Sequence, residues 1–520
     1  MKYPLLCFLL STILLASCAP STGVPVQTPT ESSTPTAALP SPTPSKTPLP
    51  EFPAAVNPLT GLAVEDPGLL DIPALLISIS HFPATARPQA GLSFAPFVYE
   101  IYITEGATRF LTVFYGEYPT PEVPLTGDCI VRGEPFTRTG IILGNRVWLD
   151  KNANGQYEAW EVGVGGVCVN LLDAATGETV QQTTSDSNGF YGFNALPGEY
   201  VIEFVKPRGW TFTAQDADDD QTDSDADAST GRTGQTSVLD ADDLSLDAGL
   251  IPPPKLPTPE PESVPRAWVG PVRSGRLIYA DLAAFYEKSC LIYAYASEEV
   301  LVHLPKCAFV EHLISGGGYM LERDRMIAIA EDHAREQGSD FNYVSNIYDE
   351  TPPAAPGLPA LQIKLYFAWQ HQSGWAYDPL YQSWHRYVDD STKGNAGILH
   401  AEVDRLTGRQ LHFENIVLLF TTHDVVSPTN LDIHLEANLT GRAILFRDGQ
   451  KYDIFWSTLL DEGEKSSGRR HPIQFLDQDG YPIALRPGHT WVTVLTPDTT
   501  VEETSPGVWQ VRFVQPPGAK

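Results

Sequence analysis

A twelve-residue segment that begins at Asp150 carries oxygen-bearing side chains at the spacing used by calcium-binding loops. Counted from Asp150, oxygen ligands occupy positions 1, 3, 5, 9 and 12, glycine occupies position 6, and position 7 can offer its backbone carbonyl. Calcium takes about six to eight hard oxygen ligands, and the glycine permits the sharp turn that makes them converge. The pattern predicts a structural calcium site with these ligands: Asp150, Asn152, Asn154, Gln156, Glu158 and Glu161.

This loop lies in a strongly acidic block. Residues 140–250 contain 19 Asp and Glu against 5 Lys and Arg, which leaves a net charge of −14, and the whole chain of 520 residues carries −30. Such a balance excludes unspecific nucleic-acid binding, because that binding needs basic side chains that displace counterions from phosphates. Cations are the partners that the composition favours.

Six charged residues outside the acidic block form a second candidate site: Arg87, Glu100, Glu105, Arg109, Arg273 and Arg276. Guanidinium groups pair bidentately with carboxylate or phosphate, so these side chains could bind a small anionic ligand if they converge. The two carboxylates could also perform acid–base chemistry. The alternative is a structural ion-pair network that fixes a sheet to a helix. An open pocket among them would favour a ligand, and burial with mutual pairing would favour the network.

No residue is assigned a catalytic role. The sequence contains no phosphate-binding loop, no CxxC pair and no HExxH helix. His81 and His371 show no metal-ligand spacing along the chain. Four tryptophans could stack on the sugars of a cell-wall glycan or fill a β-rich core: Trp375, Trp384, Trp456 and Trp491.

The elements that would position these residues are mainly strands. Residues rich in aromatic and branched side chains predict strands over 73–80, 97–103 and 109–115. Alternating polarity predicts two more in the acidic block, over 167–172 and 198–205, with Val167, Val169 and Leu171 facing inward and Cys168 outward. A helical pattern covers 281–288. The fold class predicted is multidomain α+β, with an α/β body, a β-rich C-terminal domain and an inserted immunoglobulin-like β-sandwich.

The segments on both sides of the acidic block resemble the YerB-like bacterial lipoproteins, a family of unknown function. The resemblance covers about 57–117 and 265–497. It is carried by these motifs: Asn57 to Leu62, Arg87 to Leu92, Val98 to Glu100, Glu105 to Phe110, Gly270 to Arg276, Trp375 to Asp378, Phe475 to Gly480 and Pro487 to Val492. Membership implies a two-part body and no established activity.

The acidic block itself, from Gly144 to Leu250, resembles the SdrD B-type repeat of bacterial surface proteins. The resemblance implies a β-sandwich that binds calcium through its opening acidic loop and through a later acidic segment. That segment contains Asp216, Asp218, Asp219, Asp220, Asp223, Asp225 and Asp227, and the repeat closes on a motif that contains Asp247. From this part the metal ligands assigned are Asp223, Asp225, Asp227 and Asp247. The alternative is a solvated acidic loop that stays mobile because like charges repel.

The N-terminus predicts export. Lys2 precedes an apolar run over 5–15 that is too short to span a bilayer, and small residues follow it. The ending Leu15-Ala16-Ser17-Cys18 resembles the lipobox of bacterial lipoproteins, which implies acyl chains such as palmitate on Cys18 and a membrane partner through that anchor. The alternatives are a plain signal peptide or a short membrane anchor with a chance cysteine.

Four cysteines remain after the signal peptide and the lipidated residue, in an oxidising compartment. Cys290 and Cys307 could close a short loop, and Cys168 could meet Cys129. Four free thiols are the alternative.

Composition divides the chain. The domains predicted are a signal peptide (1–18), a Pro/Thr/Ser-rich extended tether (19–56), the first part of the body (57–118), the insert (140–250), a Pro-rich linker (251–264), the second part of the body (265–360), the C-terminal domain (361–500) and a tail (501–520). The function predicted is an exported, lipid-anchored protein on the outer face of the cell envelope. It would bind or scaffold a cell-wall polymer or a surface protein rather than act as an enzyme. An envelope enzyme, or a receptor for a small anionic ligand or glycan, is the alternative.

Overall fold

The structure is a computed structural model of the chain. It describes residues 52–119, 140–158, 161–185, 189–207, 209–217, 221–238, 241–252, 267–305, 307–309, 319–379, 382–390, 395–407, 410–427 and 429–519. The predicted signal peptide with Cys18, the tether as far as residue 51, Cys129, Asp218 to Asp220 and most of the Pro-rich linker lie outside these residues.

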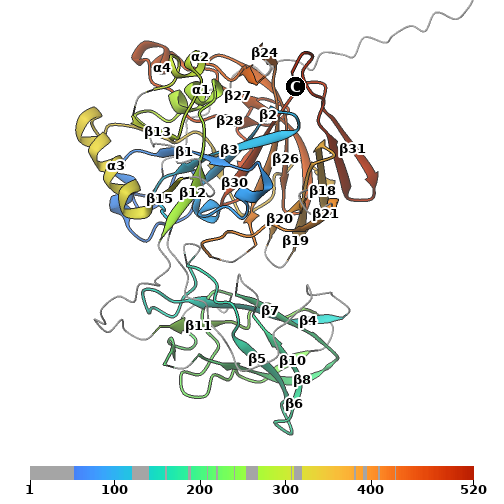
Figure 1. The fold of residues 1–520 in the computed structure, drawn as a ribbon. Helices are drawn as coiled ribbons and strands as arrows, with labels where there is room; N and C mark the ends of the chain where they lie inside the picture. Colours follow the sequence, from blue (N-terminus) through green and yellow to red (C-terminus); the bar gives the residue numbers. More distant parts are fainter. Residues whose placement is uncertain are drawn as a thin grey trace, which may run out of the picture. The chain divides into compact units, whose positions relative to one another are not determined.

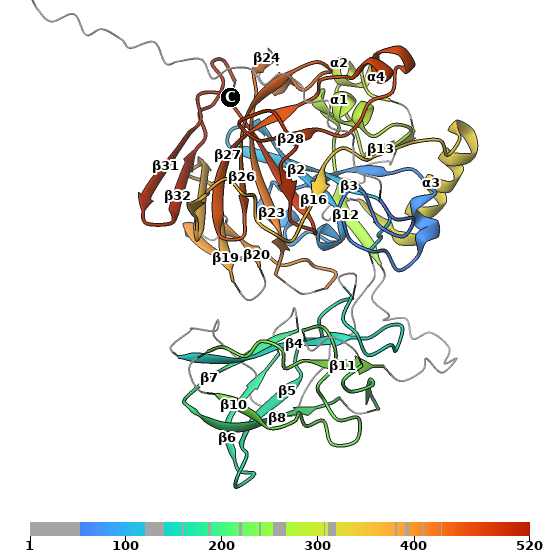
Figure 2. The ribbon, with the colours of Figure 1, turned by 180° about the vertical axis from the view of Figure 1, so that it is seen from behind.

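The described residues form two bodies with separate hydrophobic cores (Figures 1 and 2). One core joins residues from before and after the insert, between Leu59 and Phe513. The other lies wholly within the insert, between Leu143 and Leu250. Because an independent core is what lets a domain fold alone, the insert has the structural basis of a separate domain.

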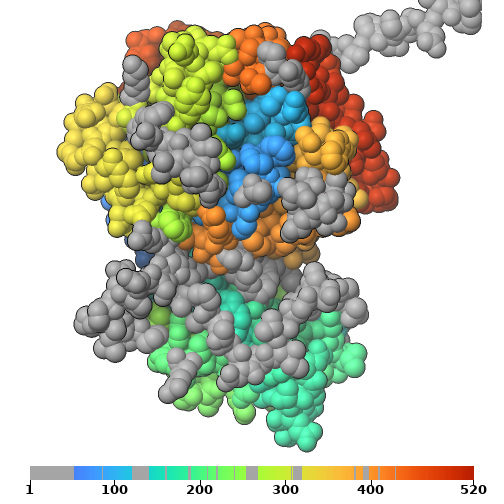
Figure 3. Space-filling model, viewed as in Figure 1, coloured from blue at the N-terminus to red at the C-terminus, as the bar shows by residue number. Residues whose placement is uncertain are grey.

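The body is built mainly of strands, so the predicted α/β character is correct only in part. Its largest sheet has the order β14 (Ala308–Phe309), β13 (Cys290–Tyr293), β1 (Leu75–Ser80), β3 (Ala107–Phe114), β2 (Phe97–Thr104), β30 (Thr490–Leu495), β23 (Asn415–Phe420), β26 (Thr440–Arg447), β27 (Gln450–Ser457) and β17 (Leu358–Pro359). At its margins lie β12 (Trp268–Val272), β15 (Tyr319–Glu322) and β28 (Gln474–Leu476). Pairing of β2 with β30 carries this sheet across the two parts of the body. In Figure 3, early (blue) and late (orange) residues lie side by side on one face of the body.

A second sheet of the body is formed by later residues. Its order is β21 (Asn395–Ala401), β20 (Ser383–Asp390), β19 (His371–Asp378), β18 (Gln362–Ala368), β32 (Val508–Arg512) and β31 (Thr500–Ser505), with β22 (His412–Phe413) beside β20. Two short pairs complete the strands: β16 (Ile347–Tyr348) with β29 (Ala484–Leu485), and β24 (His423–Ser427) with β25 (Asn430–Ile433). The four tryptophans considered as glycan platforms are buried core residues: Trp375, Trp384, Trp456 and Trp491.

Helices are few among the described residues. They are α1 (Ile278–Phe285), α2 (Glu298–Leu301), α3 (Arg323–Gln337) and α4 (Glu462–Ser467), with 3-10 turns at Pro67–Leu70, Ala84–Ala86 and Leu92–Phe94. The predicted helix over 281–288 is α1, which starts three residues earlier and ends at Phe285. No helix in the described part of the chain is long and apolar enough to cross a membrane.

The hairpin of β2 and β3 places its charged residues on opposite faces of the large sheet. Glu100 is paired with Phe110, and Ile101 is paired with Arg109. Because neighbouring residues of a strand point to opposite faces, Glu100 faces the second sheet and Arg109 faces α1. Contacts confirm both directions: Arg386 of β20 reaches Glu100, whereas Tyr286 at the end of α1 bonds Tyr99, the residue beside Glu100.

The insert is a sandwich of two four-stranded sheets. One has the order β10 (Thr236–Val238), β8 (Gly198–Val205), β5 (Cys168–Asp173) and β6 (Thr179–Thr184), and the other β7 (Phe190–Ala195), β4 (Ile141–Leu149), β11 (Ala248–Ile251) and β9 (Thr211–Phe212). Val167, Val169 and Leu171 enter its core as predicted. Cys168 lies outside that core, as the alternation predicts, although the side chain is only 4% exposed.

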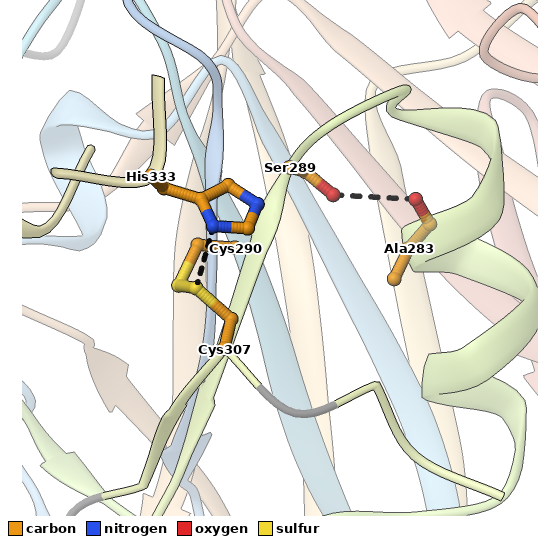
Figure 4. Close-up of a disulfide and its surroundings, with 5 residues drawn as sticks. All are labelled: Ala283, Ser289, Cys290, Cys307 and His333. Carbon is orange, nitrogen blue, oxygen red and sulfur yellow. Dashed lines mark hydrogen bonds between the residues drawn. A yellow bond between two sulfur atoms is a disulfide. The ribbon is translucent and has the colours of Figure 1, made fainter. Parts of the chain in front are cut away.

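Disulfides are present in both bodies. Cys290 is bonded to Cys307 across 17 residues, as predicted, and Figure 4 shows His333 of α3 beside this bond, with Nδ1 3.5 Å from Cys307 Sγ. Cys168 is also disulfide-bonded. Its predicted partner, Cys129, lies outside the described residues.

Candidate functional site

The acidic loop of the insert begins where β4 ends and folds around the buried carboxylate of Asp150. One oxygen, Oδ2, accepts hydrogen bonds from Gly155 N at 2.8 Å and from Thr213 Oγ1 at 2.5 Å. Gly155 has a φ of +83°, and a Cβ there would lie 2.9 Å from the carbonyl oxygen of Ala214. The glycine predicted at position 6 is therefore required both by the backbone conformation and by the close approach of the next segment.

The remaining loop residues gather around Glu158. The side-chain amides of Asn152 and Asn154 donate to Glu158 Oε1 at 3.1 and 2.6 Å. Glu161, which is 4% exposed, accepts from the backbone N–H groups of Lys151 and Glu158. All three carboxylates are thereby held on one short loop.

The loop has the electrostatics of a cation site. Burial, followed by the negative charges of Glu158 and Asp150, raises the pKa of Glu161 to about 8. Asp150 Oδ1 and Glu158 Oε2 are buried and have no hydrogen-bond partner. Buried carboxylate oxygens without donors are costly unless a cation compensates them, so the residues present fit calcium, whose ligands are hard oxygens.

The later acidic segment runs beside this loop. Gln156 forms a β-bridge with Asp223, and Ser224 N donates to the carbonyl oxygen of Gly155 at 3.2 Å. Asp223 is buried. Two loops distant in sequence are therefore joined by their backbones, with Asp223 next to the opening loop.

Three other predicted ligands lie in different surroundings. Asp247 N donates to Asp225 Oδ2 at 2.6 Å, and burial, with the charge of Asp225, raises the pKa of Asp247 well above its usual range. Asp227 Oδ1 instead accepts hydrogen bonds from Ser229 and Thr230 in a local turn. Asp225 with Asp247 forms a second acidic pair, and metal binding by these residues stays a prediction.

In the body, Glu100 lies in a buried charged network that spans the two sheets. Its oxygens accept from Arg386 Nη2 at 3.3 Å, from Thr108 Oγ1 at 3.0 Å and from Trp491 Nε1 at 3.2 Å. Arg386 Nε donates to Glu402 at 2.7 Å, and its guanidinium carbon stacks 4.2 Å from the ring centre of Trp491. Glu100 is thus buried and paired, which favours a structural role.

Two histidines meet this network although they showed no spacing in the sequence. Ligand atoms of His81, Glu100 and His371 lie within 4.8 Å of one another, the one such group of three or more found in the described part of the chain. Burial, helped by the charge of Arg87, lowers the pKa of His81 to about 3. Burial also lowers the pKa of His371, so both rings are neutral. Because Arg386 already neutralises Glu100, we interpret the group as part of the ion-pair network.

The six residues predicted as one ligand cluster do not come together, and that prediction is corrected. Arg87 joins the Glu100 network, where it donates to Asp389 O at 2.7 Å. Glu105 is exposed in the β2–β3 turn. The other three lie on the opposite face of the sheet, around the start of α1: Arg109, Arg273 and Arg276.

Comparison with family models accounts for most of both bodies. Residues 59–124 match the N-terminal domain and residues 363–492 the C-terminal domain of a protein of unknown function (DUF3048). Residues 141–250 match the SdrD B-like domain.

Two curated relatives match this chain over a stretch about as long as the insert. Serine-aspartate repeat-containing protein C of Staphylococcus aureus strain N315 is 42% identical over 115 residues, which make up 22% of this chain and 11% of the relative. The strain Newman protein is also 42% identical, over 12% of its length. The chain thus spans about a tenth of these relatives.

One solved structure resembles the chain more widely. YerB protein from Bacillus subtilis aligns with 85% of this chain and 96% of its own, at 15% identity and a TM-score of 0.44. The family models, which match both parts of the body and the SdrD B-like insert, confirm the predicted recognition. The chain carries the N-terminal and C-terminal domains of the DUF3048 family, with an SdrD B-like domain inserted between them.

Proposed function

We propose that this protein is an exported, lipid-anchored scaffold on the outer face of the cell envelope, stiffened by calcium in its β-sandwich insert. The observation that carries the proposal is the acidic loop, in which Asp150 and Glu158 keep buried oxygens without donors beside Glu161, whose pKa is raised by burial. Calcium would bind all three carboxylates and fix the loop against the segment that contains Asp223.

Anchoring and display rest on the sequence. The lipobox-like Leu15 to Cys18 supports lipid attachment at Cys18, and the Pro-rich tether would extend the folded part away from the membrane at about 3.1 Å per residue. The likeness of the insert to a serine-aspartate repeat protein of Staphylococcus aureus supports display at the cell surface. A cell-wall polymer or a surface protein is the partner that such a scaffold would hold.

An enzymatic role is less well supported by the body. Glu100 is buried, and its charge is neutralised by Arg386. Glu100 could therefore take part in acid–base chemistry or ligand binding only if the network were disrupted. Ligand binding is favoured only at the separate arginines near α1.

Trypsin treatment of intact cells tests display and calcium binding together. Lys151 is exposed and lies inside the loop, and its backbone N–H donates a hydrogen bond to Glu161. Calcium should therefore protect the peptide bond after Lys151 from trypsin. A chelator should make that bond accessible. The double variant Asp150→Asn with Glu161→Gln should be cleaved in both conditions. The matched control Glu178→Gln, an exposed carboxylate elsewhere in the insert, should behave as the wild type.

Two results would contradict the proposal separately. Equal cleavage after Lys151 in calcium and in chelator would reject the calcium site. Cleavage in lysed cells but never in intact ones would reject display at the surface.

A further inference from the structure

Arg109 is a buried cation that has no acidic partner among the residues that the structure describes. It projects from β3, where its neighbours in the sheet are Ser80 and Ile101, and it is 6% exposed. Its Nη1 donates to Ser274 Oγ at 3.2 Å, and its Nε is buried without a hydrogen-bond partner. A guanidinium removed from water normally has a carboxylate or several acceptors beside it.

The segment after β12 brings two more arginines to this position. Arg273 N donates to the carbonyl oxygen of Ser78 at 2.8 Å, and Gly275 N donates to that of Tyr295 at 2.6 Å. A Cβ on Gly275 would lie 2.4 Å from Leu304 Cδ1, so this segment packs closely against that leucine. Its backbone is thereby fixed, and Arg273 and Arg276 are held at the start of α1.

The electrostatics around Arg109 and Arg276 are those of an incomplete site. Burial, then the charges of Arg276 and Arg273, lowers the pKa of Arg109 to about 9, and only Tyr279 acts in the opposite direction. Burial also lowers the pKa of Arg276. Within the described residues neither Arg109 nor Arg276 forms an ion pair. Like charges held together away from water are unfavourable unless an anion joins them.

We propose that Arg109, Arg273 and Arg276, with the hydroxyl of Ser274, bind the phosphoryl group of a small ligand. Forked guanidinium donors match an oxyanion that carries two negative charges and several acceptor oxygens better than a singly charged carboxylate. Arg109 forms the buried base, whereas Arg273, Ser274 and Arg276 are partly exposed, so the site opens to solvent. The chain carries a net charge of −30, so attraction of an anion must come from these local donors.

Thermal unfolding and calorimetric titration of the full chain in calcium-free buffer at constant ionic strength test this site. Inorganic phosphate and sulfate should raise the melting temperature of the body, and chloride and acetate should not. Glycerol 3-phosphate, compared with inorganic phosphate, shows whether a phosphate monoester or free phosphate is preferred. Because calcium is left out, the outcome is independent of the insert.

Variants separate binding from a structural role. Arg276→Gln should weaken phosphate binding about tenfold or more, and Arg276→Lys should restore part of it. Without an added anion, Arg276→Gln should leave the melting temperature unchanged or raise it, because the substitution relieves repulsion between like charges. If Arg276 instead stabilised the fold, its replacement would lower the melting temperature. The control Arg325→Gln, which removes an exposed charge from α3, should bind as the wild type. Equal shifts with chloride, or undiminished phosphate binding by Arg276→Gln, would overturn the proposal.

Discussion

The raised pKa of Glu161 predicts how the stability of the insert depends on pH when calcium is removed. Its pKa is about 8 in the folded state, against an ordinary value of 4.5. The folded state therefore binds this proton more tightly than the unfolded state. The resulting stability is fully present below the unfolded value of 4.5 and is lost as the pH rises toward about 8.

The size of the effect follows from linkage. One pKa unit corresponds to about 1.36 kcal/mol, so the step from pH 5 to 7.5 has an upper bound of about 3 kcal/mol. Water reaches part of the loop, and we expect about 1 to 2 kcal/mol, a decrease of several degrees in melting temperature for a domain of this size. Asp247, whose pKa is also raised, contributes in the same direction.

Calcium should oppose this dependence, because it binds the ionised carboxylate. At about 1 mM calcium and a Kd of about 10⁻⁴ to 10⁻³ M, calcium should raise the free energy of unfolding by about 0.4 to 1.4 kcal/mol. This increase should become larger from pH 5 to 7.5, because the proton that competes with calcium for Glu161 is lost.

The assay is thermal unfolding of the isolated insert, residues 119–264, which retain Cys129 with Cys168, in chelator or calcium at matched ionic strength. Glu161→Gln should reduce the pH dependence and abolish most of the calcium response, and the control Glu178→Gln should keep both. The remaining slope of Glu161→Gln measures the contribution of Asp247. A Glu161→Gln variant with the wild-type slope and calcium response would refute the reasoning.

Three further predictions concern the anchor and the body. Cys18→Ala should release the protein from membranes, and its retention after an alkaline wash would contradict lipid anchoring. Deletion of residues 119–264 with the flanks rejoined should leave a body that unfolds cooperatively in denaturant, because the two hydrophobic cores share no residue. Loss of the cooperative transition would show that the body depends on the insert. Arg386→Met should lower the free energy of unfolding by about 3 to 5 kcal/mol, because two buried carboxylates lose their countercharge. The control Arg512→Gln removes an exposed charge and should change the free energy of unfolding by about 0.5 kcal/mol or less. A similarly small effect of Arg386→Met would reject the structural network.

Local patterns in the sequence predicted much of the fold. Strands 73–80, 97–103, 109–115 and 198–205 correspond to β1, β2, β3 and β8, because alternation and β-branched residues report directly on strand faces. The sequence could not show that β30 pairs with β2, since pairing between segments so far apart leaves no local signal.

The split of the six charged residues depends on an irregularity that the sequence does not show. A regular hairpin with its turn at Glu105 and Gly106 would pair Arg109 with Tyr102 and place it on the face of Glu100, but the register shifts between Tyr102 and Thr104, so Arg109 pairs with Ile101 and faces the other way. The network around Glu100 also could not be predicted, because His371 and Arg386 come from strands much later in the chain, and only the fold brings them to it.

Calorimetric titration of the insert with calcium at neutral pH tests the central claim most directly. We predict saturable binding with a Kd of about 10⁻⁴ to 10⁻³ M, release of protons as Glu161 ionises, much weaker binding of magnesium, and loss of binding in Asp150→Ala with Glu161→Ala. No saturable heat up to about 10 mM calcium, or equal binding of magnesium, would show that the acidic loop is only a turn and would contradict the calcium-stiffened scaffold.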